Sequence, residues 1–570
     1  MKTTIKASAL AAALLCASVS QAIEIKGDSV SGNFDSTVSI GVGVRAGSPA
    51  CAGVIGSFAG STTPLAATGP GAPAGCADVL SSYNDQGNLN YAKHDRFTTY
   101  VKGTHELLLN LPEEIKFLGR VSWLRDFAAT SVSGIQSGAG GPAPFAEGAR
   151  DDLRQKVRLL DLWLSKSFTV GEERVRIRAG NQVVNWGESL FLPGSLNQTN
   201  AVDLMRLAQP GTQLKEAVLP APMLNVSSGL GHGLSIEAYL QQGWNGNYFP
   251  PVGSYWSTAS VGKGADAYGV PNAHEPRNGG QYGVALRYQP SGTSLNLGLY
   301  AINYHDKSPV LEVSATSSSG FAYRYLEDRK LLGLSANFPL GNWAIGTELS
   351  YRPRDAVSLN ASAPGLADNS LTPAFGVRAC LAGGQCHVEQ KKYQWHVTGL
   401  LSLTPSDHGP ILDLLGANTA TLLAEAVLVR YPDLQSQYQG VPVAAGGWGF
   451  GYDTTVNADR TGAGVPGAAG TRNSYGYNFD FSWVYDGSLI PGWQVVPELY
   501  FFHAVRGRTP NMTATFMQGA KSANFIVGFI QNPAKWQFSV NYARFWGGDT
   551  VFDQPLRDRS FVGATLSRNF

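Results

Sequence analysis

The sequence predicts an all-β protein, a closed antiparallel transmembrane β-barrel of roughly 14–18 strands with long extracellular loops and a short helical insert. Three observations predict this fold: strands that alternate apolar and polar residues, connections that alternate short and long, and an amino terminus typical of exported proteins. No later segment has the roughly eighteen apolar residues that a membrane-spanning helix needs. An exported chain of this kind either stays soluble or enters a membrane as a barrel.

The amino-terminal segment has the features of a signal peptide. A short positive region and an apolar stretch precede Ser20-Gln21-Ala22, which supplies small residues at the two positions that signal peptidase needs. We therefore expect residues 1–22 to be the signal peptide and residues 23–570 to form an outer-membrane β-barrel of a Gram-negative bacterium. The 43 basic and 42 acidic residues nearly cancel, which argues against nucleic acid as a partner.

The clearest predicted strand is "YGYNFDFSWVY", from Tyr475 to Tyr485. Every second residue is aromatic, and the residues between them are mostly polar or small. Because successive side chains of a strand point to opposite faces, one face is aromatic and the other is polar. In a barrel the aromatic face would meet lipid and the polar face a wet lumen, whereas a soluble sheet would bury the aromatic face. Similar alternation recurs at 234–240, 282–288, 295–301, 343–351, 393–403 and 536–542.

Two further patterns favour lipid. Aromatic residues lie at both ends of some apolar faces, as Trp343 and Tyr351 do, which is typical of aromatic girdles at the headgroups. Short connections with Gly and Pro, such as "FPLGNW", alternate with long ones. The long connections are roughly 46–88, 133–151, 244–279, 354–390 and 431–472.

The last strand ends on Phe570, which resembles the recognition signal of the outer-membrane assembly machinery. That machinery and outer-membrane lipid are therefore expected partners. Arg568 departs from the pattern because it shares a face with Leu566 and Phe570. An arginine at the membrane edge can extend its charge to the headgroups.

Four cysteines remain after residue 22, in two near pairs within stretches rich in Gly, Ala and Pro. In an oxidising compartment they would form two loop disulfides, Cys51 with Cys76 and Cys380 with Cys386. The alternative is a metal site that includes His387, but Cys-x5-Cys-His matches no strong zinc spacing. We therefore expect disulfides and no metal.

The stretch 174–224 is the most informative for function. It begins with a strand that places Arg174, Arg176 and Arg178 on one face. On a lumen wall these arginines would form a positive ladder that favours anions. Alternatively, they pair with lumen carboxylates. Candidates are Asp151, Asp152 and Asp161.

The run from Trp186 to Leu224 is not strand-like. Asn200 is in a position to cap a short helix through about Ala208, and Pro210-Gly211 would end it. A second helical turn is expected near 213–217. A segment this long, 186–224, either folds into the lumen as a hatch or forms an ordinary external loop, and both readings stay open.

This stretch also resembles a large proteobacterial family of outer-membrane barrels defined by a domain of unknown function. The resemblance rests on the residues of Gln-x-x-x-x-Trp-Gly-Glu-Ser and on several that follow. They are Gln182, Trp186, Gly187, Glu188, Ser189, Asn200, Asp203, Pro210, Gly211, Lys215 and Glu216. Residues 324–337 also resemble the family. Members often accompany a periplasmic lipid-carrier-like protein and an inner-membrane transporter of the resistance-nodulation-division type.

The resemblance implies traffic of hydrophobic or amphipathic molecules across the envelope, with neither direction nor cargo defined. Trp186, Glu188, Asp203 and Arg206 would then line a gate. The alternative is a structural anchor, in which the tryptophan packs the turn and the glutamate pairs with a lumen arginine.

Catalysis is not expected, and neither is a cofactor. No Gly-x-Ser-x-Gly element appears. The acidic pairs that could share acid–base work are adjacent in sequence, so on a strand their side chains point to opposite faces; they are Glu113-Glu114, Asp151-Asp152 and Glu172-Glu173. The favoured function is an outer-membrane channel or transporter for hydrophobic or amphipathic small molecules. The alternatives are a secreted soluble β-protein that binds or cleaves carbohydrate or lipid, and a structural barrel with a blocked lumen.

Overall fold

The computed structural model describes most of the chain. The described residues are 23–48, 87, 90–132, 145, 147–251, 253–257, 273–313, 321–359, 381, 384–444, 469–511, 514–549 and 553–570. The expected signal peptide, Cys51, Cys76 and Cys380 lie outside these ranges, so the predictions for them stay predictions.

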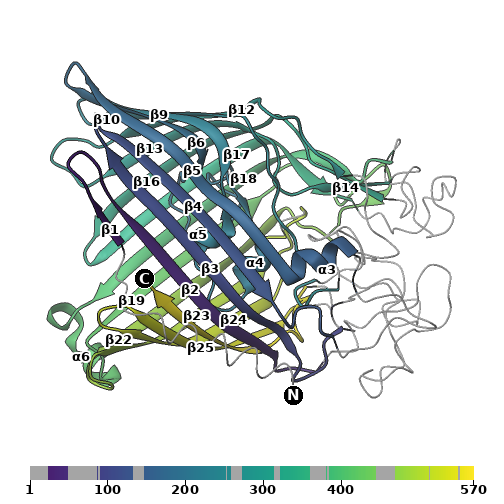
Figure 1. Cartoon of the computed structure of the whole chain (residues 1–570). Coiled ribbons are helices and arrows are strands. Elements are labelled where there is room, and N and C mark those ends of the chain that lie inside the picture. Colours follow the sequence, from purple (N-terminus) through teal and green to yellow (C-terminus); the bar gives the residue numbers. More distant parts are fainter. Residues whose placement is uncertain are drawn as a thin grey trace.

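Eighteen antiparallel strands form one closed barrel (Figure 1). Around the ring they are β2 (Ser31–Arg45), β3 (Arg96–Leu111), β4 (Ile115–Asp126), β5 (Gln155–Val170), β6 (Glu173–Gln182), β9 (Ala221–Gly231), β10 (Leu234–Gln241), β12 (Gln281–Tyr288), β13 (Asn296–Tyr304), β16 (Arg329–Leu340), β17 (Trp343–Ser358), β18 (His387–Leu403), β19 (Thr419–Arg430), β22 (Asn473–Asp486), β23 (Trp493–Arg506), β24 (Ala520–Gln531), β25 (Trp536–Gly547) and β26 (Phe561–Asn569). Pairing of β2 with β26 closes the ring and leaves no free sheet edge. The predicted fold class is confirmed, at the upper end of the predicted strand number.

The remaining elements are short. The short strands are β1 (Ile23–Lys26), β7 (Ala201–Val202), β8 (Val218–Leu219), β11 (Ala273–His274), β14 (Val310–Val313), β15 (Phe321–Arg324), β20 (Gln437–Tyr438) and β21 (Val441–Pro442). The helices are α3 (Glu147–Arg154), α4 (Leu204–Ala208), α5 (Leu214–Ala217) and α6 (Pro405–Leu415). No helix in the described ranges is both long and apolar enough to cross a membrane.

The two faces of the wall differ as the alternation predicts. On β22, Ser474 and Asn478 are buried on the inner face, whereas Tyr475 and Tyr477 are 37% and 39% exposed on the outer face. On β16, Leu331 is fully buried while Leu332 is 55% exposed. The aromatic and aliphatic rows therefore do not pack into a sandwich core. An outer surface of this kind is stable in hydrocarbon, where every backbone group must pair within the sheet.

The connections are short at one end of the barrel and long at the other. The short end includes two-residue turns between β5 and β6 and between β16 and β17. In the connection between β18 and β19, α6 covers the outer wall through contact of Leu412 with Leu403 and Ala420. Helix α6 is visible at this end of Figure 1. The expected alternation of connections follows from the antiparallel topology.

Arg568, which breaks the apolar row of the last strand, lies against aromatic rings. Its guanidinium carbon is 5.0 Å from the ring centre of Trp536 and 4.8 Å from that of Phe570. Cation–π contact of this kind accommodates the charge at the short-turn end of the outer wall.

Candidate functional site

The segment 183–220, which we call the insert, connects β6 to β9 and lies inside the barrel. It hydrogen-bonds to inward-facing side chains of β17, β18 and β19, and also to inward-facing side chains of β3. These strands belong to different parts of the ring, so the insert reaches across the interior. Helices α4 and α5 of the insert lie within the outline of the barrel in Figure 1. Residues 221–224, which the sequence placed with this segment, belong to β9.

Glu348 of β17 makes the first tie between the insert and the wall. Its side chain points inward, is almost fully buried, and accepts hydrogen bonds from three backbone N–H groups of the insert. The donors are Glu188, Ser189 at 3.1 Å and Leu196 at 3.3 Å. Burying a carboxylate costs free energy unless hydrogen bonds compensate for the lost water. The N–H groups of the insert therefore stabilise buried Glu348, and Glu348 in turn holds the insert against the wall.

Glu425 of β19 makes the second tie. Its carboxylate accepts from the N–H groups of Leu190, Phe191 and Leu192 at 3.4, 2.8 and 2.9 Å. His396, fully buried on β18, contacts the same carboxylate through Nδ1 at 2.6 Å. The backbone of 188–196 thus forms an arc whose N–H groups point at two wall carboxylates.

The carbonyl groups of the arc are satisfied by the same wall. Arg352 donates to the carbonyl oxygens of Gly194 and Ser195 at 2.6 and 3.0 Å. Gln394 donates to that of Pro193 at 3.0 Å. Because donors and acceptors of the arc both find wall partners, its position is set by directional bonds and not by packing alone.

The second half of the insert is tied to β3 through Glu216. Lys102 forms a buried ion pair with Glu216, and Thr104 donates to it at 2.7 Å. Tyr100 and Lys102 each donate at 2.7 Å to carbonyl oxygens of the insert, those of Pro210 and Gly211. Burial alone would raise the pKa of Glu216, but Lys102 and Thr104 outweigh it and hold the pKa below the usual value.

Trp186 anchors the root of the insert against the wall. It is 2% exposed, its Nε1 donates to Glu237 of β10 at 2.9 Å, and its ring centre lies 5.1 Å from that of Tyr239. Gly283 of β12 faces the indole, and a Cβ there would lie 2.8 Å from it. Only glycine fits this wall position without displacing the tryptophan.

Glu188 lies at the start of the arc and accepts a hydrogen bond from Asn337 Nδ2 at 2.9 Å. Burial raises the pKa of the Glu188 carboxyl, although this hydrogen bond opposes the shift. Arg287 pairs with Glu237, at 2.9 Å. Trp186 thus contacts β10 and Glu188 contacts β16, whereas the arginine nearby pairs with Glu237 and not with Glu188.

Asp203 lies just before α4 and Arg206 lies within it. Asp203 caps the helix by accepting from the Arg206 N–H at 2.7 Å, and it forms an ion pair with Arg158. The expectation that Asn200 caps this helix is wrong. The Asn200 side chain instead donates to the carbonyl oxygen of Val184 at 2.6 Å. This bond closes the neck of the insert, where residues 183–185 meet residues 197–200. The helix therefore starts later, at Leu204.

Arg206 is a buried charge of the insert whose guanidinium lacks part of its hydrogen bonding. Its side chain is 4% exposed, and Nη1 has no hydrogen-bond partner among the described residues. Burial lowers its pKa, with neighbouring Arg158 adding to the effect and Asp203 opposing it. A guanidinium held this way depends on the acids around it.

The three arginines of β6 make different contacts. Arg174 pairs with Glu114 at 2.5 Å at the exposed short-turn rim. Arg178 donates to Gln182 and to Val183 at the neck of the insert. Arg176 is exposed and forms no ion pair within the part of the chain that the structure describes. Two of the three acids considered as partners have other contacts. Asp161 pairs with Arg120, and Asp152 accepts from Tyr248.

Three leucines of the insert stay exposed inside the barrel. Leu190, Leu207 and Leu214 are 45%, 50% and 64% exposed, whereas neighbouring Arg206 and Glu216 are buried. Apolar side chains that face an aqueous lumen at a narrow point are unfavourable unless they meet an apolar solute or exclude water. Sequence reasoning missed them, and it also missed Glu348 and Glu425. The visible signal was an acidic residue on the polar face of a predicted strand.

A model of the family described as "Protein of unknown function (DUF1302)" matches residues 3–570. The chain belongs to the DUF1302 family. This confirms the family resemblance seen in the motif around Trp186. No curated protein matches this DUF1302 chain in sequence.

Among solved structures, this DUF1302 barrel is similar to Acinetobacter baumannii OccAB1, with 12% identity, a TM-score of 0.40 and coverage of 95% of this chain and 96% of that one. It is also similar to Pseudomonas aeruginosa OpdK solved with vanillate, with 10% identity, a TM-score of 0.38 and coverage of 94% and 98%. A third is P. aeruginosa OccK2 in complex with glucuronate, with 11% identity, a TM-score of 0.38 and coverage of 95% and 97%. Vanillate and glucuronate are ligands of those proteins.

Proposed function

We propose that this protein is an outer-membrane channel or transporter for hydrophobic or amphipathic small molecules, in which the insert forms the constriction. The observation that carries the proposal is the insert itself, which is tied to the wall on both sides and presents exposed leucines to the lumen. A plain aqueous pore has no need of apolar side chains at its narrow point. A solute with an apolar part would cover them during passage.

Charges on the wall support the amphipathic part of the proposal. Arg176 and Arg178 lie on β6, whereas Asp480 and Glu498 lie on the inner faces of β22 and β23. Strands β6 and β22 are ninth neighbours in either direction around the eighteen-strand ring, so they face each other across the lumen. Opposed basic and acidic walls create a field across the pore that orients a charged or zwitterionic headgroup.

The test compares two zwitterions that share a headgroup, hexanoylcarnitine and carnitine, in flux measurements with proteoliposomes. We expect the wild-type protein to pass hexanoylcarnitine several-fold faster than carnitine. Changing Leu190, Leu207 and Leu214 to serine removes the apolar surface, so it should lower hexanoylcarnitine flux several-fold and leave carnitine flux within twofold. Leu489→Ser is the matched control, because Leu489 is 57% exposed in the turn between β22 and β23, outside the insert.

Equal flux of both zwitterions through the wild-type protein would contradict an apolar selectivity element. Absence of flux for both, with a folded barrel, would favour the structural barrel with a blocked lumen. Glu348, Glu425 and Glu216 hold the insert to the wall through hydrogen bonds and an ion pair, so the blocked barrel is the alternative to test first.

Cellular context forms the second part of the proposal. We infer that a signal peptide is removed after Ala22, that the assembly machinery reads the strand ending at Phe570, and that a periplasmic carrier and an inner-membrane transporter supply or receive the cargo. Loop disulfides that join Cys51 to Cys76 and Cys380 to Cys386 belong to the same proposal, and mass spectrometry of unreduced peptides would test them. The proposed passage needs no covalent step.

A further inference from the structure

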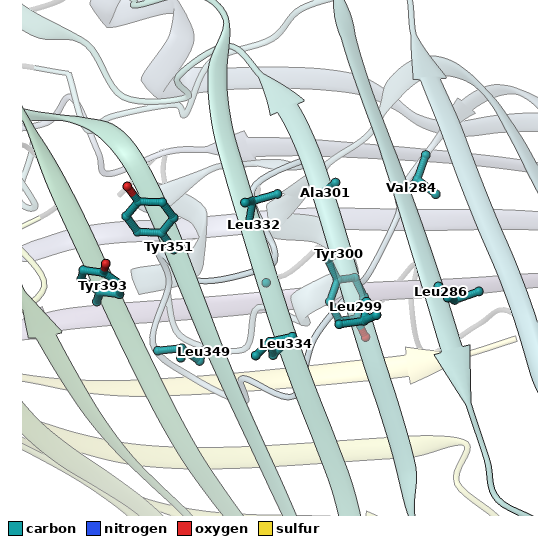
Figure 2. A pocket seen from close by; sticks show the side chains of 11 residues that line it. Val284, Leu286, Leu299, Tyr300, Ala301, Leu332, Leu334, Leu349, Tyr351 and Tyr393 are labelled. Atoms are coloured by element: carbon teal, nitrogen blue, oxygen red, sulfur yellow. The ribbon is translucent and has the colours of Figure 1, made fainter.

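The outer wall carries an apolar groove across β12, β13, β16, β17 and β18 (Figure 2). Its volume is 560 Å³, and aliphatic side chains line most of it. Figure 2 shows Leu299 and Ala301 of β13 beside Leu332 and Leu334 of β16, with two tyrosines at one end. These side chains are on the face that meets the bilayer, so the groove is separate from the lumen and from the insert.

The strand register explains the groove. Ala301 pairs with Leu332, and Leu332 pairs with Tyr351, which forms one row across the strands. A second row joins Leu299, Leu334 and Leu349. The rows are roughly 6.6 Å apart, the spacing of alternate residues along a strand. Because Ala301 is the smallest outward residue of the first row, the groove is open there.

The end of the groove toward the long connections is polar and basic. The rings of Tyr351 and Tyr393 stack with centres 4.9 Å apart. One outward position further toward the long connections, Lys391 lies beyond Tyr393 on β18 and Lys330 lies beyond Leu332 on β16, and both lysines are exposed. Lys391 contacts Asp433 at 3.3 Å, whereas Lys330 forms no ion pair with the described residues. Aromatic hydroxyls followed by lysines mark the headgroup level of a leaflet.

We propose that this groove binds one acyl chain of a phosphorylated glycolipid of the outer leaflet, with a phosphate of the same molecule on Lys330. The groove is continuous with the lipid-facing surface, and its basic end is on the long-loop side, where the outer leaflet lies. Charge on the lysine complements a phosphate, and branched aliphatic walls complement an acyl chain. The proposal goes beyond the solute that passes through the lumen and does not depend on it.

Native mass spectrometry of the purified full-length barrel in mild detergent tests this site, with bisphosphorylated hexa-acyl lipid A as the probe. We expect one bound lipid A on the wild-type protein. Ala301→Phe fills the groove and Lys330→Gln removes the charge, so each should lower the bound fraction at least fivefold. Matched controls are Ala564→Phe on β26 and Lys521→Gln on β24, which also face outward and should stay within twofold of wild type.

Heat-modifiable gel migration reports folding of each variant, and Lys330→Gln alone decides the matter if Ala301→Phe does not fold. Equal lipid A binding by wild type, Ala301→Phe and Lys330→Gln would overturn the proposal. Equal binding of phosphatidylglycerol, which lacks the phosphorylated sugar, would also overturn it. So would a dimer of the protein that dissociates in Ala301→Phe while lipid A binding stays unchanged.

Discussion

Replacing Glu348 with alanine should release the first tie of the insert while the barrel stays folded. The carboxylate accepts three backbone N–H groups, from Glu188, Ser189 and Leu196. At about 1.5 kcal/mol for each hydrogen bond to a charged acceptor, their loss costs roughly 4.5 kcal/mol of the free energy that holds the arc against the wall. That cost is a factor of about 2,000 in the local closing equilibrium.

The assay is amide hydrogen exchange of residues 188–196, followed by mass spectrometry in nanodiscs. We expect exchange in this arc to accelerate by about two to three orders of magnitude in Glu348→Ala, because local opening exposes the N–H groups. Thr421→Ala, an inward change on β19 near Glu425, serves as the control and should leave the arc protected. Unchanged exchange in the arc of a folded Glu348→Ala barrel would refute the view that the carboxylate holds the insert.

Four further predictions concern other parts of the site. Gly283→Val should drive a side chain into Tyr239 and Trp186 and lower stability by about 1–3 kcal/mol, seen as a lower temperature of the heat-modifiable shift; an unchanged temperature would mean that both rings are free to move. Lys102→Met should weaken the tie through Glu216 more than the double change Lys102→Met with Glu216→Leu, measured by exchange of 204–217; additive effects would count against a buried pair. Since the pKa of Glu216 is lowered in the folded state, its contribution is complete well above pH 4.5 and is lost as the pH falls, so the protection factor of 204–217, corrected for the intrinsic pH dependence of amide exchange, should fall in acid only. Arg176→Gln should shift ion selectivity toward cations in planar bilayers, and unchanged selectivity would remove this arginine from the mechanism.

The fold was accessible from sequence because a strand displays its environment with a period of two. Tyr475 and Tyr477 are exposed on the outer face and Asn478 is buried on the inner face, as their alternation indicates. Each such strand is a local pattern of about ten residues, and closure then follows from the need to pair every edge in lipid. The exact strand number was less accessible, because strands in the first third of the chain, such as β4 (Ile115–Asp126), show less regular alternation.

The ties of the insert could not be predicted in the same way. Glu425 binds the N–H groups of 190–192, more than 230 positions earlier in the chain, and no local pattern links the two. Trp186 was found because it belongs to a motif, whereas its partner Gly283 has no local reason to be glycine. The misplaced helix cap has a similar cause. Asn200 has good capping chemistry, but a tertiary contact with Val184 takes its side chain and leaves the cap to Asp203.

Single-channel conductance of a barrel without the arc tests the central claim most directly. Asn185 and Asn197 hydrogen-bond through their side chains at 2.9 Å, so residues 187–196, which contain the arc 188–196, start and end at one place and can be replaced by two glycines without straining the neck. If the insert is the constriction, the shortened barrel should conduct several-fold more than wild type in planar bilayers. Equal conductance of the two folded proteins would contradict the account, because the narrow point would then lie elsewhere.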